Sequence, residues 1–201
     1  MIAFDEIQKD AITEILNVAI GHAASSLNEM VEEEVSLSVP SLDIISRIDA
    51  IQRLSGGEDT VAVKQRFKGP FWGEVMLIFP ERKSLDLVRT ITRDTVPLDS
   101  LTELEQEALM EVGNIILNAC LGSIANQLGR SLESSLPLYL RGHGAGLFGD
   151  GPGAGDLVLF LHVDFALRQQ QIYGYVAFIL EIASALSFRE VVDDYLGSLG
   201  C

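Results

Sequence analysis

Three polar residues recur in one pattern in two segments of the chain. In "DAITEILN", residues 10–17, and in "EALMEVGN", residues 107–114, an acid is followed after three residues by Glu and after two more by Asn. A carboxylate accepts hydrogen bonds or pairs with a cation, whereas a carboxamide both donates and accepts, so it can hold a water molecule in a fixed direction. Neither group is a strong nucleophile or base at neutral pH. The pattern therefore favours a site that aims a water at an electrophile supplied by a partner.

A helix would place each triplet on one narrow face. With about 100° of rotation per residue, Glu14 falls about 40° from Asp10, and Asn17 falls about 20° on its other side. The aliphatic neighbours fall opposite, where they would pack on a core, so we expect the triplet to face solvent. The second triplet follows the same geometry: Glu107, Glu111 and Asn114. Acids and amides on an exposed helix face are also ordinary solubilising surface, and one helix alone does not separate the two interpretations.

The two triplets belong to a longer repeat. Their members lie 97 residues apart, and the same offset relates Ser26 to Ser123 and Pro40 to Pro137. We interpret this offset as an internal duplication, with halves of about 1–96 and 97–201. Solvent-facing positions accept almost any polar residue, so a face that keeps Glu and Asn through a duplication indicates a function for those residues.

Each half is predicted to fold as α-β-β-β-α. The predicted segments are helix 5–31, strands 35–45, 60–68 and 71–79, and helix 81–94, then helix 101–129, strands 134–141, 156–166 and 172–182, and helix 184–198. Residues 46–54 fit either a short helix or an irregular strand end. Because short connections usually join antiparallel neighbours, we predict one α+β domain over 1–201. It would have pseudo-two-fold symmetry, an antiparallel sheet and long helices packed on one side.

Composition limits the possible partners and location. The chain is 48% apolar, and its 14 basic and 29 acidic residues give a net charge of −15. Nucleic acid is disfavoured as a partner because phosphate binding requires a basic surface. No apolar run reaches the roughly 18–20 residues of a membrane span, and "MIAFDEIQKD" lacks the pattern of a secretion signal. We expect a cytoplasmic protein without membrane insertion.

Other candidate motifs are better explained by structure than by chemistry. "GAGLFG", residues 144–149, has the spacing of a dinucleotide-binding loop, but "DGPGAGD" follows in place of the helix that such a site needs. We therefore interpret residues 142–155 as a loop. His22, His143 and His162 share no ligand spacing, and Cys120 lies in an apolar helical pattern as a buried thiol. No metal site is predicted.

The repeated pattern resembles a family signature. Asp-x3-Glu-x2-Asn-x22-Pro is similar to the signature of the CheC, CheX and FliY phosphatases of bacterial chemotaxis, which hydrolyse the aspartyl phosphate of the response regulator CheY. The full match comprises Asp10, Glu14, Asn17 and Pro40, and the match with one change comprises Glu107, Glu111, Asn114 and Pro137. Two copies in one chain resemble CheC more than CheX, which carries one.

The resemblance implies a mechanism. In such a phosphatase the Glu pairs with a lysine of the receiver, and the Asn orients the attacking water in line with the leaving carboxylate, so catalysis is positioning and electrostatics. The residues so assigned are Glu14 and Asn17 in the first site and Glu111 and Asn114 in the second, with Asp10 and Glu107 as supporting residues. Mg²⁺ would stay on the receiver, which implies no metal or cofactor of the chain's own.

The two sites depart differently from the family pattern. Family members carry Gly just before the Asn and Gly four residues after it. Gly113 keeps the first glycine and Gly21 keeps the second, while Leu16 and Asn118 replace the other two. Asn118 would add bulk where a receiver must approach, so we expect the first site to be the more active.

Two other functions remain open. The chain could be a binding module that regulates the receptor deamidase CheD, or that sequesters a phosphorylated receiver without hydrolysing it. The last predicted helix is where we would look for contact with CheD. A component of the flagellar switch is a third possibility, which the sequence supports less because it shows no extension for docking to a switch.

Overall fold

The computed structural model describes residues 2–31, 34–54, 59–92, 102–148, 156–167 and 170–200. The elements of the first half are α1 (Glu6–Val31), β1 (Val35–Ser46), α2 (Arg47–Leu54), β2 (Thr60–Lys68), β3 (Gly73–Pro80) and α3 (Glu81–Thr92). Those of the second half are α4 (Glu103–Gln127), β4 (Glu133–Ser134), β5 (Leu138–Gly142), α5 (Gly144–Phe148), β6 (Leu157–Leu167), β7 (Gln170–Leu180) and α6 (Ile182–Leu199).

The strands form one antiparallel sheet, which confirms the predicted α+β class. The strand order is β1-β6-β7-β3-β2-β4, and β5 also pairs with β2. Matching strands of the two halves take equivalent places: β3 and β7 are the central pair, β2 and β6 flank them, and β1 lies at one edge as β4 and β5 lie at the other. The pseudo-two-fold axis therefore passes between β7 and β3. Common descent of the two halves stays a prediction from the sequence.

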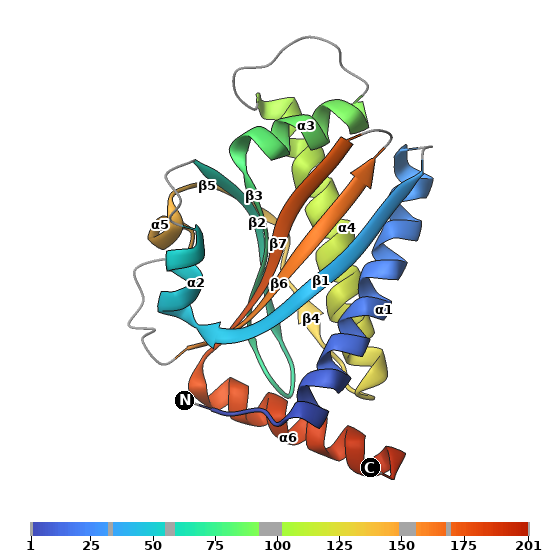
Figure 1. The fold of residues 1–201 in the computed structure, drawn as a ribbon, viewed down its shortest axis with the longest axis vertical. Coiled ribbons are helices and arrows are strands. Elements are labelled where there is room, and N and C mark those ends of the chain that lie inside the picture. The colour runs from blue at the N-terminus through green and yellow to red at the C-terminus, as the bar shows by residue number, and fades with distance from the viewer. Residues whose placement is uncertain are drawn as a thin grey trace.

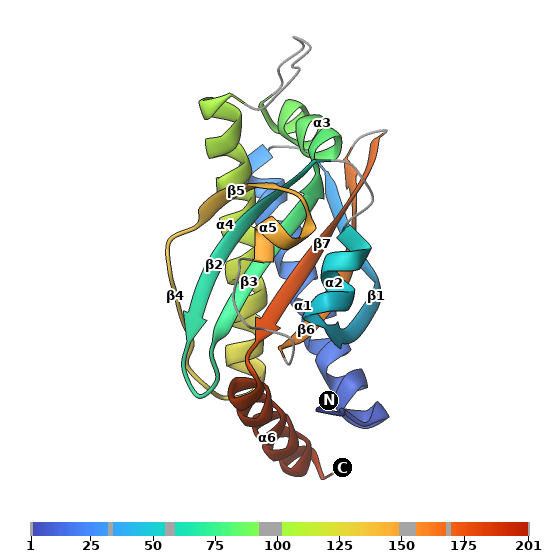
Figure 2. The same ribbon diagram turned by 90° about the vertical axis from the view of Figure 1, so that its left-hand side faces the viewer.

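Both long helices cover one face of the sheet, as predicted. α1 and α4 lie side by side behind the strands in Figure 1 and run in opposite directions, and Figure 2 shows the same layer from the side. Their apolar faces are buried in the larger core together with the inward side chains of the strands. Each triplet lies in the first half of its helix. Because the helices run in opposite directions, the two triplets lie toward opposite ends of this layer.

Two short helices, α2 and α5, cover part of the other face of the sheet. They bury side chains in a second, smaller core: Ala50, Leu54, Leu147 and Phe148 pack with residues of β2, β3, β6 and β7. The sequence left residues 46–54 ambiguous, and the structure makes 47–54 a helix. The interpretation of 142–155 as a loop was wrong for 144–148, where burial of two large apolar side chains outweighs the poor helix propensity of glycine. Residues 149–155 lie outside the described residues.

The remaining helices close the two ends of the sheet. α3 contacts the start of α4 at one end, and α6 crosses the start of α1 at the other (Figure 1). A capping box precedes α4, in which Glu105 accepts a hydrogen bond from the backbone N–H of Thr102 at 2.9 Å. The boundary between the two predicted halves, at residues 96 and 97, lies outside the described residues.

By length and composition alone, α4 could cross a membrane. Half of its most apolar 18-residue window is buried inside the fold, and its outward face carries Glu107, Glu111 and Asn118. Such a pattern is typical of a core helix in a folded domain.

Candidate functional site

The first triplet lies on the exposed face of α1. Asp10, Glu14 and Asn17 are exposed, while Ile12 and Leu16 on the opposite side are almost fully buried. Within the described residues, no hydrogen bond or ion pair ties the three side chains to the rest of the chain. The triplet has the outward orientation expected from helical spacing, and the amide of Asn17 keeps both its donor and its acceptor for a visiting molecule.

The second triplet, on α4, is exposed only in part. Glu107 and Glu111 are exposed, but Asn114 is half-buried. The Oδ1 atom of Asn114 accepts a hydrogen bond from Nε2 of Gln65 at 3.0 Å and another from Nδ2 of Asn118 at 2.8 Å. The two triplets therefore share residue types and spacing but differ in what holds the asparagine.

A close approach of α4 to β2 explains this difference. A Cβ atom on Gly113 would lie 2.5 Å from the Cβ of Val63, so only glycine permits the helix to lie this near the strand. Gln65 follows Val63 by two residues on the same face of β2. It is 1% exposed, and its amide contacts Asn114 from the sheet side of α4. In α1 the matching position is Leu16, whose side chain is itself buried in the core.

Asn118 was expected to add bulk at the docking face, and the structure gives it a specific arrangement. The side chain is exposed, donates to Asn114, and accepts a hydrogen bond from the hydroxyl of Ser134 in β4 at 3.1 Å. The matching position in α1 is Gly21, where an added Cβ would meet no atom within 4 Å. The surface after the asparagine is thus open in the first site and occupied in the second.

The two prolines of the repeat lie where the pairing of strands is interrupted. Pro40 falls at the register shift of β1 between Ser38 and Ser41, and Pro137 separates β4 from β5. Proline has no N–H to donate to a ladder, so it is accommodated where pairing is interrupted. Pro40 therefore marks an irregularity within β1, and Pro137 directly precedes the start of β5.

Cys120 is buried in α4, as predicted. Burial raises the pKa of its thiol to about 12, because the apolar surroundings disfavour the thiolate. Cys120 therefore remains protonated at physiological pH and cannot serve as a nucleophile.

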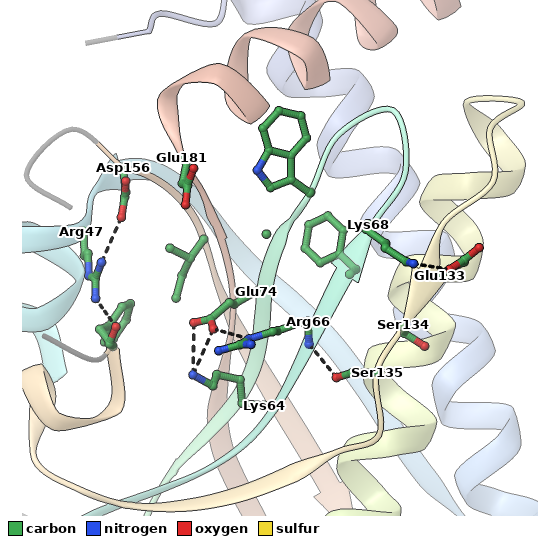
Figure 3. A pocket seen from close by; sticks show the side chains of 15 residues that line it. Arg47, Lys64, Arg66, Lys68, Glu74, Glu133, Ser134, Ser135, Asp156 and Glu181 are labelled. Carbon is green, nitrogen blue, oxygen red and sulfur yellow. Dashed lines mark hydrogen bonds and ion pairs between the residues drawn. The ribbon is translucent and has the colours of Figure 1, made fainter. Parts of the chain in front are cut away.

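A groove of about 940 Å³ opens on the opposite face of the sheet, and sequence reasoning missed it. Its basic side chains Lys64, Arg66 and Lys68 alternate along β2, a period-two signal that was available in the sequence. Figure 3 shows them in ion pairs: Lys64–Glu74 at 3.1 Å, Arg66–Glu74 at 3.3 Å, Lys68–Glu133 at 2.9 Å and Arg47–Asp156 at 3.0 Å. The groove is balanced in charge, and its basic side chains on β2 lie on the face of that strand opposite to Gln65, which contacts Asn114. A protein-docking face requires no groove, so we keep the helical face as the candidate site.

No group of three or more His, Cys, Asp or Glu side chains is arranged to hold a metal ion among the residues that the structure describes. The expectation that the chain has no metal or cofactor of its own stays a prediction.

The chain is similar in sequence to known chemotaxis proteins. The chain is 26% identical over 136 residues to the CheY-P phosphatase CheC of Bacillus subtilis, a match that covers 66% of this chain and 65% of that protein. It is 22% identical over 171 residues to CheC1 of Halobacterium salinarum, covering 82% of this chain and 87% of the relative. No family model matches the sequence.

Solved structures show the same fold. The chain superposes on FliY of Thermotoga maritima with a TM-score of 0.79 and 16% identity, over 96% of this chain and all of that one. The predicted resemblance to the CheC-like chemotaxis phosphatase family is confirmed. The middle domain of FliM from H. pylori also matches, with a TM-score of 0.71 and 9% identity over 94% of this chain and 99% of that one. The CheC-like fold thus occurs in proteins with different names, so activity must be argued from the two triplets.

Proposed function

We propose that the chain is a protein-aspartyl-phosphate phosphatase that acts on a phosphorylated CheY-type receiver in chemotaxis signalling. The observation that carries the proposal is the exposed Glu14–Asn17 pair, whose amide is held by no other side chain in the described part of the chain. The names of the CheC relatives and the family signature support the same reaction. We propose that the protein works in the cytoplasm, where such receivers are found.

In this proposal Glu14 binds and Asn17 orients. The carboxylate of Glu14 pairs with a lysine of the receiver, which fixes how the two proteins dock. Oδ1 of Asn17 accepts a hydrogen bond from a water molecule and turns a lone pair of that water toward phosphorus. A P–O bond forms from the water while the P–O bond to the aspartyl carboxylate breaks; both protons of the water remain on the inorganic phosphate, and the receiver regains its unphosphorylated aspartate side chain. We expect Mg²⁺ to be carried by the receiver.

The test is phosphate release from a radiolabelled CheY-type receiver. Wild-type protein should accelerate release. Asn17→Ala should lose most of that acceleration, because the water at the first site is no longer aimed; the rate at that site should fall about 10²-fold. Asn114→Ala should cost less, and the double variant should have no activity above the receiver's own decay. Asn126→Ala is the control, since Asn126 is an exposed asparagine at the far end of α4. Wild-type protein without effect would refute the proposal.

A binding module is the second candidate. α6 exposes Ile182 (53%) and Leu186 (39%), which favours contact with a protein on this helix. CheD is the partner we would test first, by mixing it with wild-type protein and with a Leu186→Asp variant on a sizing column. A stable complex, together with unchanged release of phosphate from the receiver, would favour a regulatory module over a phosphatase.

A further inference from the structure

A chain of hydrogen bonds from three elements ends on Asn114. Ser134 of β4 donates to Oδ1 of Asn118 at 3.1 Å, and Nδ2 of Asn118 donates to Oδ1 of Asn114 at 2.8 Å. From the other side, Nε2 of Gln65 in β2 donates to the same Oδ1 at 3.0 Å. Because a carbonyl oxygen has two lone pairs, both acceptor positions of Asn114 are occupied.

The occupied oxygen changes what Asn114 can offer a partner. Only its NH₂ group remains available, and that group is a donor. A water held by a donor uses one lone pair in the hydrogen bond and lacks the hydrogen bond to an amide oxygen that would orient it and polarise its O–H bond, so it is a poorer nucleophile than a water held by an amide oxygen. A phosphoryl oxygen, which only accepts, is instead well matched to the NH₂ group.

Burial of the Gln65 side chain does not stabilise the fold. The side chain is 1% exposed in the larger core, and its Oε1 atom is buried without a hydrogen-bond partner in the described part of the chain. Burial of an unpaired amide oxygen is unfavourable, and an apolar side chain of the same length would avoid it. Among the described residues, the one hydrogen bond of this side-chain amide is donated to the asparagine of the second triplet.

The first half has no equivalent arrangement. The position that matches Asn118 is Gly21, which carries no side chain, and Asn17 is exposed without a hydrogen-bonding side chain among the described residues. The first site can therefore present either the oxygen or the NH₂ group of its amide, whereas the second presents the NH₂ group alone.

We infer that Gln65 and Asn118 are positioning residues that hold Asn114 by its oxygen, so that the second site binds the phosphoryl group of a receiver but hydrolyses it more slowly than the first. This inference rests on the proposed phosphatase function. It assigns binding of the phosphoryl group chiefly to the second site, at one end of the helical layer, and hydrolysis chiefly to the first site, at the other end.

The first test measures the second site alone, in an Asn17→Ala background. Adding Asn118→Gly copies the residue that the first half has at this place. It should raise kcat about fivefold, the change expected when one hydrogen bond of ordinary strength no longer holds the oxygen. KM should change little, because Glu111 is untouched. Gln65→Met, which keeps the length of the side chain and removes its donor, should act in the same direction.

The reciprocal test measures the first site alone, in an Asn114→Ala background. Adding Gly21→Asn places a donor four residues after Asn17, and the open surface at Gly21 admits the side chain without a clash. kcat should fall about fivefold with KM nearly unchanged. A purely structural effect of Asn118 would not be transferred to the other helix by this change.

The outcomes separate this inference from the proposed function. Release by wild-type protein with no change in kcat for either Asn118→Gly or Gly21→Asn overturns the inference alone. A lower kcat for Asn118→Gly also overturns it, because the hydrogen bonds would then prepare Asn114 for catalysis. Absence of release by wild-type protein overturns the proposed function and this inference with it. Opposite changes in kcat at the two sites support the inference even if Gln65→Met fails to fold.

Discussion

A Cβ atom built on Gly113 would lie 2.5 Å from the Cβ of Val63, a separation that real Cβ atoms do not reach. Glycine at this position is what lets α4 lie directly on β2. The same approach brings Asn114 within hydrogen-bonding distance of Gln65. In α1 a leucine takes the position of the glycine, and the asparagine after it remains exposed. The difference between the two triplets therefore begins with the absence of one side chain.

Gly113→Ala should destabilise the fold. We expect the free energy of unfolding to fall by about 1–3 kcal/mol, because the added methyl group forces α4 away from a strand in the middle of the core. The better helix propensity of alanine offsets only about 1 kcal/mol of this loss. Urea unfolding followed by circular dichroism measures the change.

Gly122→Ala is the matched control on the same helix. A Cβ atom at Gly122 meets no atom within 4 Å, so we expect the variant to be as stable as wild type or more stable by up to about 1 kcal/mol. Equal destabilisation by both substitutions would show that close packing on Val63 is not the reason for Gly113.

Much of this fold could be predicted because the repeat and the apolar periodicity are local properties of the sequence. Long helices and buried strands such as "EVMLIF" produce a periodic or continuous apolar pattern over many residues. The offset of 97 residues located the second triplet from the first. α5 was missed because Gly144 and Gly146 argue against a helix, and only the tertiary burial of Leu147 and Phe148 stabilises one. Local patterns do not contain that information.

The sequence predicted the outward direction of the first triplet and the bulk of Asn118 at the second, but not the hydrogen bonds that hold Asn114. Helical spacing fixes the direction of Glu14 and Asn17, because it depends only on positions within one helix. The contact between Gln65 and Asn114 joins residues 49 positions apart, and it depends on how closely a helix and a strand pack. The alternation along β2 is consistent with the burial of Gln65, but nothing in the sequence indicated that its amide would be directed at the second triplet.

Arg47→Met should destabilise the fold strongly. Arg47 pairs with Asp156 at 3.0 Å with both side chains largely buried, and it also donates to the carbonyl oxygen of Phe148 at the end of α5. Removing one member of such a pair leaves a buried charge without its partner, which costs about 3–5 kcal/mol. The exposed pair Arg53–Asp43 is the control, and Arg53→Met should lose about 1 kcal/mol or less. Thermal unfolding of the two variants would contradict this prediction if their midpoints coincided.

The buried thiol of Cys120 should make stability depend on alkaline pH. Burial raises its pKa from 9.0 to about 12, so the unfolded chain loses this proton at lower pH than the folded chain does. The stabilisation is complete below the unfolded pKa and is lost as the pH rises through the folded value, so the free energy of unfolding should decrease between about pH 9 and 12. Urea titrations at two pH values in this range should show a shallower decrease for Cys120→Ala. An identical decrease in both proteins would assign the effect to other groups.

Glu14→Gln should weaken docking of the receiver without slowing chemistry. In an Asn114→Ala background, where only the first site acts, we expect KM to rise about tenfold and kcat to stay near its starting value, because the carboxylate pairs with the receiver in the ground state and the transition state alike. Salt should raise KM of the parent more than that of the variant, since salt screens the charge pair that the variant lacks. Glu29→Gln, an exposed change about 22 Å further along α1, is the control. A fall in kcat at unchanged KM would move Glu14 from docking to the reacting atoms, and the division of roles between Glu14 and Asn17 would have to be reversed.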